Sequence, residues 1–332
     1  MTPRLRLLAA AVVVLLGAAP LGAYLKLGSR VGDRTVTLKW NQFPVRYFVT
    51  DRPAEGVGVP EFQAAIERAF ATWHAVETAQ ISSEFAGFTQ AQPFEDDDMS
   101  VLGFVDRSDQ DRTLAATSFL IDTRDGTILE SDIFFNSSFR WGTSDPGVQG
   151  RFDLESIAVH EIGHLLGLSH SALGETELVS GGRRVIAAET VMFPIAFSSG
   201  STADRTLKAD DIAGMSDIYR TSASSRQFGS ISGRVTKNGA GVVGAHVVAF
   251  NPRTRALIGG FSLGSDGAFV IAGLEPGPHL LRVEPLDDGD IDSFFDDSFG
   301  VDVDFSVKFH ERVVVVPRGG GTMNVEIRVT PK

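Results

Sequence analysis

Three of the chain's seven histidines lie in one short stretch, HEIGHLLGLSH, at residues 160–170. His160 and His164 are four positions apart, so on a helix their side chains point in the same direction. Two neutral imidazoles one turn apart can bind a single divalent cation, and zinc, at about 2.0–2.1 Å from each nitrogen, fits that span. The spacing therefore predicts that His160 and His164 are zinc ligands.

The neighbouring residues complete a catalytic kind of site. Glu161 is rotated by about a third of a turn from His160, where it can act as a base on water at the metal without being a ligand. Gly167 can adopt a left-handed conformation that ends the helix and turns the chain back, which brings His170 in as the third ligand. Three protein ligands leave one coordination position open, as in catalytic zinc sites. The alternative, surface histidines on an amphipathic helix, leaves the glycine and third histidine unexplained.

The pattern of apolar residues predicts the elements that carry these side chains. The stretch FDLESIAVHEIGHLLG is typical of a helix with Asp153 as its N-cap. Two further helices are predicted at about 61–76 and 208–219, because apolar residues recur there at helical spacing. Alternating residues predict strands at 36–40 and 44–50, and short strands with turns are expected from 81 to 141. An α+β domain follows from this order.

The last third of the chain has a different character. A polar stretch of small residues at 221–229 is typical of a linker, and short strands with Gly and Pro turns follow, which predicts a small β-sandwich. His246, His279 and His310 are too scattered there to form a second cluster. We therefore expect that a fragment ending near Ser222 folds, binds zinc and cleaves peptides by itself.

Composition narrows the class of protein. The net charge of −12 offers no basic surface for nucleic acid or anionic lipid. The chain has no cysteine, so thiolate chemistry is excluded and zinc must be held by histidine and carboxylate. Arg4 and Arg6, an apolar run and small residues up to Ala23 predict a signal peptide, with a retained membrane anchor as the alternative. We expect a secreted or periplasmic protein that is a monomer and has no membrane span after signal removal.

The motif HExxHxxGxxH resembles the metzincin signature, which includes a later methionine turn. The stretch ETVMFP at 189–194 is similar to that turn, and the resemblance places Met192 under the zinc-binding histidines. Ser171, directly after the third histidine, resembles the matrixin branch. The resemblance covers about 35–220 and implies a metzincin-like domain, with a mixed twisted sheet, three main helices and a zinc-dependent peptidase activity in which Glu161 is the general base.

The resemblance also implies where substrate binds and where the chain departs from matrixins. TLAATSF, 113–119, is similar to the edge strand that pairs with substrate. This similarity assigns Leu114 and Ala115 to substrate binding, together with Pro194.

Matrixins usually hold a second zinc ion. In this chain Ala116 stands where one of the histidine ligands of that second zinc would be, so one zinc is expected. Ala196 replaces a tyrosine that many matrixins place on the specificity-pocket wall. Nearby aspartates leave open either a calcium site or a solvated acidic surface: Asp106, Asp109, Asp111, Asp122 and Asp125.

The C-terminal stretches ISGRVTKNGAGVVGAHVVAFN and SDGAFVIAGLEPGPHLLRVEP resemble a carboxypeptidase-regulatory-like domain, an Ig-like or transthyretin-like sandwich that is usually an accessory or adhesion module. The acidic insert at 287–305 is either a calcium-binding or a solvated loop.

The predicted organisation is a signal peptide at 1–23, a matrixin-like metallopeptidase domain at 24–222, a linker at 223–229 and the sandwich at 230–332. We expect an exported zinc endopeptidase with protein or peptide substrates. A catalytically inert adhesion or binding protein is the alternative, and the intact Glu161 and histidines favour the enzyme.

Overall fold

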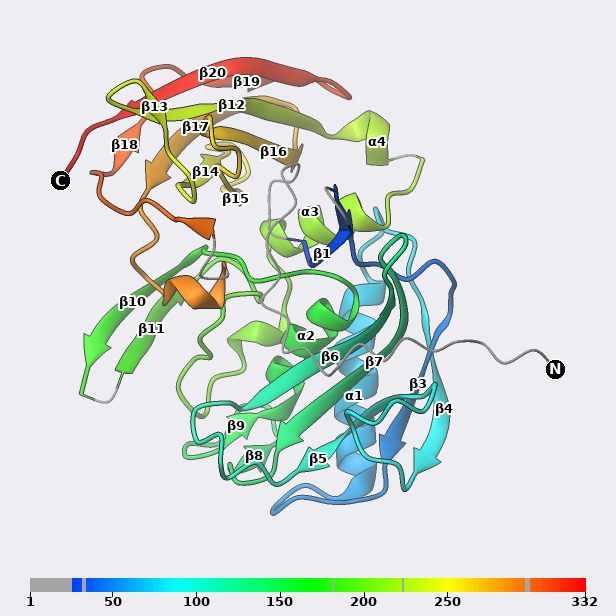
Figure 1. The fold of residues 1–332 in the computed structure, drawn as a ribbon. Helices are drawn as coiled ribbons and strands as arrows, with labels where there is room; N and C mark the ends of the chain where they lie inside the picture. Colours follow the sequence, from blue (N-terminus) through cyan, green and yellow to red (C-terminus); the bar gives the residue numbers. More distant parts are fainter. Residues whose placement is uncertain (1–25, 32–33, 181, 223, 296–298) are drawn as a thin grey trace.

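The structure is a computed structural model that describes residues 26–31, 34–180, 182–222, 224–295 and 299–332 (Figure 1). The predicted signal peptide at 1–23 and residue 223 of the predicted linker lie outside the described residues. Within them, none of the helices is both long enough and apolar enough to cross a bilayer.

A five-stranded sheet forms the base of the first part of the chain. Its strands, in spatial order, are β4 (Ser83–Thr89), β3 (Val45–Thr50), β5 (Ser100–Val105), β7 (Thr127–Asn136) and β6 (Ala115–Asp122). All neighbouring pairs are parallel except β6 with β7, so β6 is an antiparallel strand at the edge of a mixed sheet. The predicted mixed sheet is therefore present.

Two helices, α1 (Val59–His74) and α2 (Leu154–Leu165), pack against each other and against this sheet. The apolar face of α1 is fully buried, and the indole Nε1 of Trp73 donates a hydrogen bond to the carbonyl of Val159 at 2.8 Å. The third helix, α3 (Ala209–Ile218), follows later in the chain. The three predicted helices are thus confirmed, with ends shifted by one or two residues.

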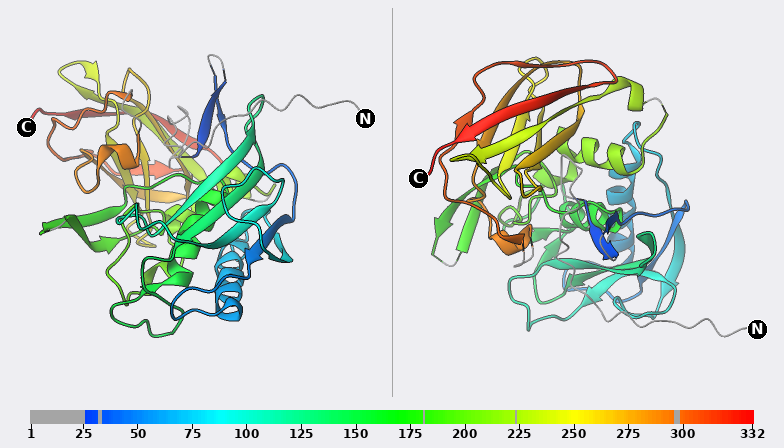
Figure 2. Two further views of the ribbon diagram at one scale, coloured as in Figure 1. Left: turned by 60° about the horizontal axis from the view of Figure 1, so that its bottom comes forward. Right: turned by 45° about the horizontal axis from the view of Figure 1, so that its top comes forward.

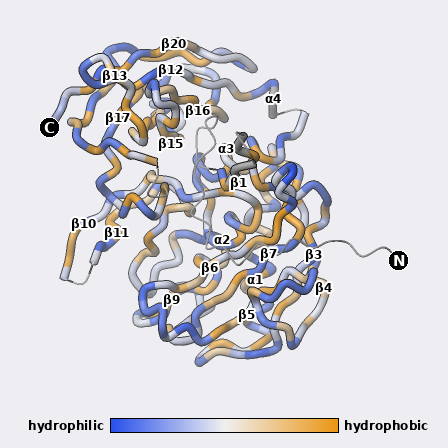
Figure 3. Tube along the Cα trace, in the orientation of Figure 1, coloured by the Kyte–Doolittle hydropathy of each residue, from blue (hydrophilic) through white to orange (hydrophobic). Residues whose placement is uncertain are grey.

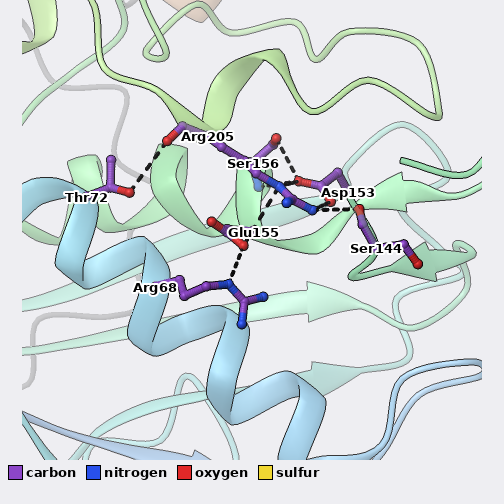
Figure 4. A network of polar contacts seen from close by, with 7 residues as sticks. All are labelled: Arg68, Thr72, Ser144, Asp153, Glu155, Ser156 and Arg205. Carbon is purple, nitrogen blue, oxygen red and sulfur yellow. Dashed lines mark hydrogen bonds and ion pairs between the residues drawn. The ribbon is translucent and has the colours of Figure 1, made fainter. Parts of the chain in front are cut away.

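The N-terminus of α2 is anchored by charged side chains (Figure 4). The carboxylate of Asp153 accepts a hydrogen bond from the backbone N–H of Ser156 at 2.9 Å, which confirms it as the N-cap. The guanidinium of Arg205 donates to the same carboxylate at 2.5 and 2.8 Å. Glu155, one residue on, pairs with Arg68 of α1 at 2.6 Å. These contacts fix the start of the helix that carries His160 and His164.

Several short elements connect the main ones. They are β1 (Gly28–Val31), β2 (Arg34–Thr37), β8 (Trp141–Gly142), β9 (Phe152–Asp153), β10 (Gly174–Val179), β11 (Gly182–Ala188), η1 (Ala203–Arg205) and α4 (Ser224–Gln227). The β10–β11 hairpin projects from the body (Figures 1 and 3), and two hydrophobic residues at the end of β10 are exposed, Leu178 at 78% and Val179 at 42%. The predicted linker at 223–229 is partly regular structure, because it contains α4 and the first residue of the next strand.

The second part is built from two sheets (Figure 2). One contains β12 (Gly229–Lys237), β13 (Ala240–Gly241), β16 (Ala268–Leu274) and β20 (Gly321–Val329); the other contains β14 (His246–Phe250), β15 (Leu257–Phe261), β17 (Gly277–Glu284), β18 (Lys308–Phe309) and β19 (Val314–Val316). A single helical turn, η2 (Ile291–Ser293), interrupts the strands. Helix α3 lies against β15 and β16, so the two parts share one continuous apolar core.

Candidate metal centre

The three predicted histidine ligands meet at one point. The Nε2 atom of His164 lies 3.1 Å from Nε2 of His160 and 3.2 Å from Nε2 of His170. Three nitrogens bound to one zinc in tetrahedral geometry at 2.0–2.1 Å are separated by about 3.3 Å. Among the described residues this is the one group of three or more histidine and carboxylate side chains gathered within metal-binding distance. The donor set and its spacing therefore fit a single zinc ion.

The opposite ring nitrogen of each histidine has a backbone acceptor. The Nδ1 atoms of His160, His164 and His170 lie 2.7, 2.8 and 2.5 Å from the carbonyl oxygens of Val191, Leu168 and Ser293, respectively. A proton on Nδ1 satisfies each carbonyl and leaves the lone pair of Nε2 free for the metal. All three imidazoles are thus held in the orientation and tautomer that a metal requires.

Burial keeps these imidazoles neutral. Desolvation, together with the neighbouring His170, lowers the pKa of His160 to about 3. Desolvation also lowers the pKa of His164 and of His170 below the usual histidine value. Because only a neutral imidazole can bind a metal ion, the site is ready to bind without first losing protons at neutral pH.

The two glycines of the motif, Gly163 and Gly167, are each required for a different structural reason. A Cβ on Gly163 would lie 2.8 Å from the Trp73 ring and closer still to the sulfur of Met192. Met192 is 2% exposed, and its side chain packs against the helix turn between His160 and His164. Gly167 has a φ of +97°, which confirms the left-handed turn that redirects the chain towards His170.

A buried aspartate holds the methionine turn in place. The carboxylate of Asp211 accepts hydrogen bonds from the backbone N–H of Val191 at 3.0 Å and from the hydroxyl of Thr190 at 2.6 Å. Val191 also supplies the backbone carbonyl that accepts a hydrogen bond from His160. Asp211 therefore acts structurally, by holding the backbone of the methionine turn.

The carboxylate of Glu161 lies beside the histidines and is 6% exposed. Burial raises the pKa of Glu161 to about 7, and a hydrogen bond from the Thr117 hydroxyl to Oε2, at 2.7 Å, partly opposes that rise. Thr117 belongs to the edge strand β6, so this strand touches the carboxylate directly. A carboxylate with a pKa near neutrality can both accept and return a proton.

The predicted substrate-binding residues lie at the start of the edge strand and next to the methionine turn. The carbonyl of Leu114 accepts a hydrogen bond from Asn136 of β7, and Ala115 is paired with Phe135. Because hydrogen bonding alternates along an antiparallel pair, the backbone polar groups of Ala115 face the open edge. Pro194 is half-buried two residues after Met192. Within the part of the chain that the structure describes, no strand pairs with the outer edge of β6 beside Glu161.

Other site features were not predicted from the sequence. They are the hydroxyl of Thr117, the contact of Gly163 with Met192, and the carbonyl of Ser293. The first two features have a weak signal in the sequence, because Thr117, Gly163 and Met192 lie in or beside recognised motifs. The third has none, because every residue carries a backbone carbonyl.

The five aspartates that left a calcium site open are not brought together as a ligand group among the described residues. Asp109 instead pairs with Arg107, and Asp122 pairs with Arg124.

Several known metalloproteinases are similar in sequence to part of this chain. Metalloendoproteinase 1 of Glycine max is 34% identical over 123 residues, which cover 33% of this chain and 35% of that protein. Metalloendoproteinase 5-MMP of Arabidopsis thaliana is 42% identical over 67 residues, 20% of this chain and 14% of that protein. Matrix metalloproteinase-16 of Rattus norvegicus is 31% identical over 140 residues, 40% of this chain and 22% of that protein. The chain thus spans about a third or less of these relatives.

Among solved structures, a minor pilin of Streptococcus agalactiae matches 32% of this chain and 45% of its own, with 12% identity and a TM-score of 0.23, too low to inform the fold. The matrixin family profile, by contrast, matches residues 39–220, more than half of the chain, and includes all three histidines, Glu161 and Met192. The chain therefore belongs to the matrixin family.

Proposed function

We propose that this protein is an exported zinc-dependent endopeptidase in which His160, His164 and His170 hold one zinc ion and Glu161 is the general base. The observation that carries this proposal is the set of three Nε2 atoms, 3.1 and 3.2 Å apart, beside a buried carboxylate. Membership of the matrixin family supports the same conclusion.

The chain's own residues divide the chemistry between them. Zinc, when bound, supplies a Lewis acid that polarises the peptide carbonyl and lowers the pKa of water from 15.7 towards about 7. Glu161 takes the proton of the attacking water and then donates it to the leaving amine. Thr117 holds the carboxylate of Glu161 in place through its hydroxyl.

The open edge of β6 supports binding of an extended peptide or protein segment. Backbone groups of Ala115 can pair with the main chain of a substrate, which would add one strand to the sheet. Leu114 and Pro194 would contact its side chains. Main-chain pairing of this kind is independent of sequence, so it suits an enzyme that cleaves unstructured protein.

Further parts of the proposal rest on the sequence. Residues 1–23 would direct export, as a cleaved signal peptide. The second part would be a carboxypeptidase-regulatory-like sandwich with an accessory role, since the described part of residues 230–332 contains two facing sheets. We expect the protein to be a monomer.

The test is purification of the protein, measurement of bound zinc and assay of cleavage of an unstructured protein. Glu161→Gln should retain one zinc per chain and lose about 10²- to 10⁴-fold in kcat, the usual contribution of general acid–base catalysis. The matched control is Glu175→Gln, an exposed carboxylate on β10, which should behave as the wild type. A wild-type protein that binds zinc but cleaves no substrate would instead favour the inert binding protein.

A further inference from the structure

The third histidine differs from the other two in where its partner comes from. His160 and His164 donate to carbonyls of Val191 and Leu168, which lie in the same part of the chain. His170 instead lies 2.5 Å from the carbonyl of Ser293, which is 123 residues away and belongs to the second part. The orientation of one zinc ligand therefore depends on a segment beyond the matrixin match.

That segment, residues 286–295, is called here the strap. It is anchored by aromatic packing, because Phe294 is 2% exposed and Phe295 is fully buried. Both rings join an apolar cluster that also contains Ala172 and Phe193 of the first part. The ring of Phe294 also meets the imidazole of His170 edge-on, with centroids 6.3 Å apart. The strap is thus fixed directly after Ser293 by contacts close to the site.

Polar contacts tie the beginning of the strap to the β10–β11 hairpin. The carboxylate of Asp288 accepts a hydrogen bond from the backbone N–H of Thr176 at 2.7 Å. The guanidinium of Arg183 donates to the carbonyl of Asp287 at 2.9 Å. The hairpin lies between His170 and the methionine turn in sequence, so these contacts connect the strap to the chain that leaves the metal centre.

A second connection joins the residue after His170 to the β-sheet. The hydroxyl of Ser171 donates to Oδ2 of the buried Asp210 at 2.7 Å. The other oxygen of that carboxylate accepts from the backbone N–H of Gly259, on β15, at 2.9 Å. The chain at His170 and Ser171 is therefore held by the second part at two separate points.

We propose that the second part of the chain completes the metal centre, and that the strap, through the carbonyl of Ser293, positions His170 as a zinc ligand. Ser293 is a positioning residue, since it contacts the ligand and not the metal or substrate. The inference rests on the proposed zinc site. It replaces the expectation that a fragment ending near Ser222 has a complete site, because such a fragment lacks the acceptor for His170.

Zinc affinity of the full-length protein tests this inference. Phe294→Ala removes the ring that holds the strap, whereas Asp292→Ala changes an exposed residue of the same helical turn and is the matched control. Because loss of outer-shell partners typically weakens metal binding by about 10–100-fold, Phe294→Ala should raise the zinc Kd at least tenfold, as measured by chelator competition. Asp292→Ala should leave the Kd within about twofold of the wild-type value, as expected for an exposed position.

A second variant and a second readout separate this effect from general misfolding. Asp288→Ala removes the polar anchor without opening the aromatic cluster, and it should also raise the Kd. In zinc-loaded protein with ¹⁵N-labelled histidine, the Nδ1 proton of His170 should be slowly exchanging in the wild type and fast in both variants, while those of His160 and His164 stay protected. Wild-type zinc binding that persists unchanged in both folded variants would overturn the inference, whereas absence of zinc binding in the wild type would overturn the proposed function.

Discussion

The hydroxyl of Thr117 lies 2.7 Å from Oε2 of Glu161, so the edge strand of the sheet touches the carboxylate at the centre of the site. β6 thus has two relationships to the proposed chemistry. Its outer edge is the strand edge that we propose pairs with substrate, and the side chain of Thr117 contacts the proposed base. A shift in the position of β6 would therefore alter both the strand edge and the contact of Thr117 with Glu161.

Replacement of Thr117 by valine removes this hydrogen bond while keeping the shape of the side chain. Hydrogen bonds to charged groups contribute about 1.5–3 kcal/mol, so we expect kcat to fall about tenfold or more. Zinc affinity should stay unchanged, since Thr117 touches no zinc ligand. Ser118→Ala on the same strand is the control, and steady-state kinetics with a chelator titration measure both quantities. Equal kcat values for Thr117→Val and wild type would contradict the assigned role.

Gly163→Ala tests the packing under the two-histidine turn. The added methyl group would collide with Met192 and Trp73, neither of which has free space around it. Overpacking of this kind costs about 1–3 kcal/mol of unfolding free energy, measurable by denaturant titration. At Gly142, by comparison, the nearest atoms are 3.4 Å away on the Arg151 side chain, so Gly142→Ala should be nearly neutral. A Gly163→Ala protein as stable as the wild type would show that Met192 does not pack under the turn.

Asp153→Ala should weaken the start of α2. The variant loses the N-cap, worth about 0.5–2 kcal/mol, and leaves Arg205 with only the more distant carboxylate of Glu155, at 3.8 Å. Because the side chain of Arg205 is only 15% exposed, we expect a total loss of about 2–4 kcal/mol in the free energy of unfolding. The exposed Asp111→Ala is the comparison variant. Thermal unfolding curves of the two would coincide if the charged network contributed nothing.

Zinc removal should destabilise the protein, since the ion binds only the folded arrangement of the three histidines. At a free zinc concentration 1,000 times the Kd, binding contributes about 4.1 kcal/mol, so a chelator should lower the Tm markedly. His164→Ala should abolish this zinc-dependent shift, whereas His310→Ala, far from the site in sequence and on the second part, should keep it. A shift of equal size in both variants would place the stabilising zinc elsewhere.

Most of the primary site was predictable because it is encoded locally. The four-residue spacing of His160 and His164 becomes a shared direction on any helix, and the left-handed Gly167 brings His170 back within a few residues. The methionine turn has its own short motif. The backbone geometry of one helix and one turn is sufficient to predict where such side chains lie.

The remaining features depend on contacts between distant segments. The hydroxyl of Thr117 reaches Glu161 only because β6 pairs with β7 and lies along α2. The carbonyl of Ser293 reaches His170 only because aromatic packing holds the strap against the first part. A carbonyl is common to every residue and therefore leaves no mark in a sequence pattern. The sequence alone determined which residues could bind zinc, and the tertiary structure decided what holds them, because those acceptors are backbone groups brought close by packing.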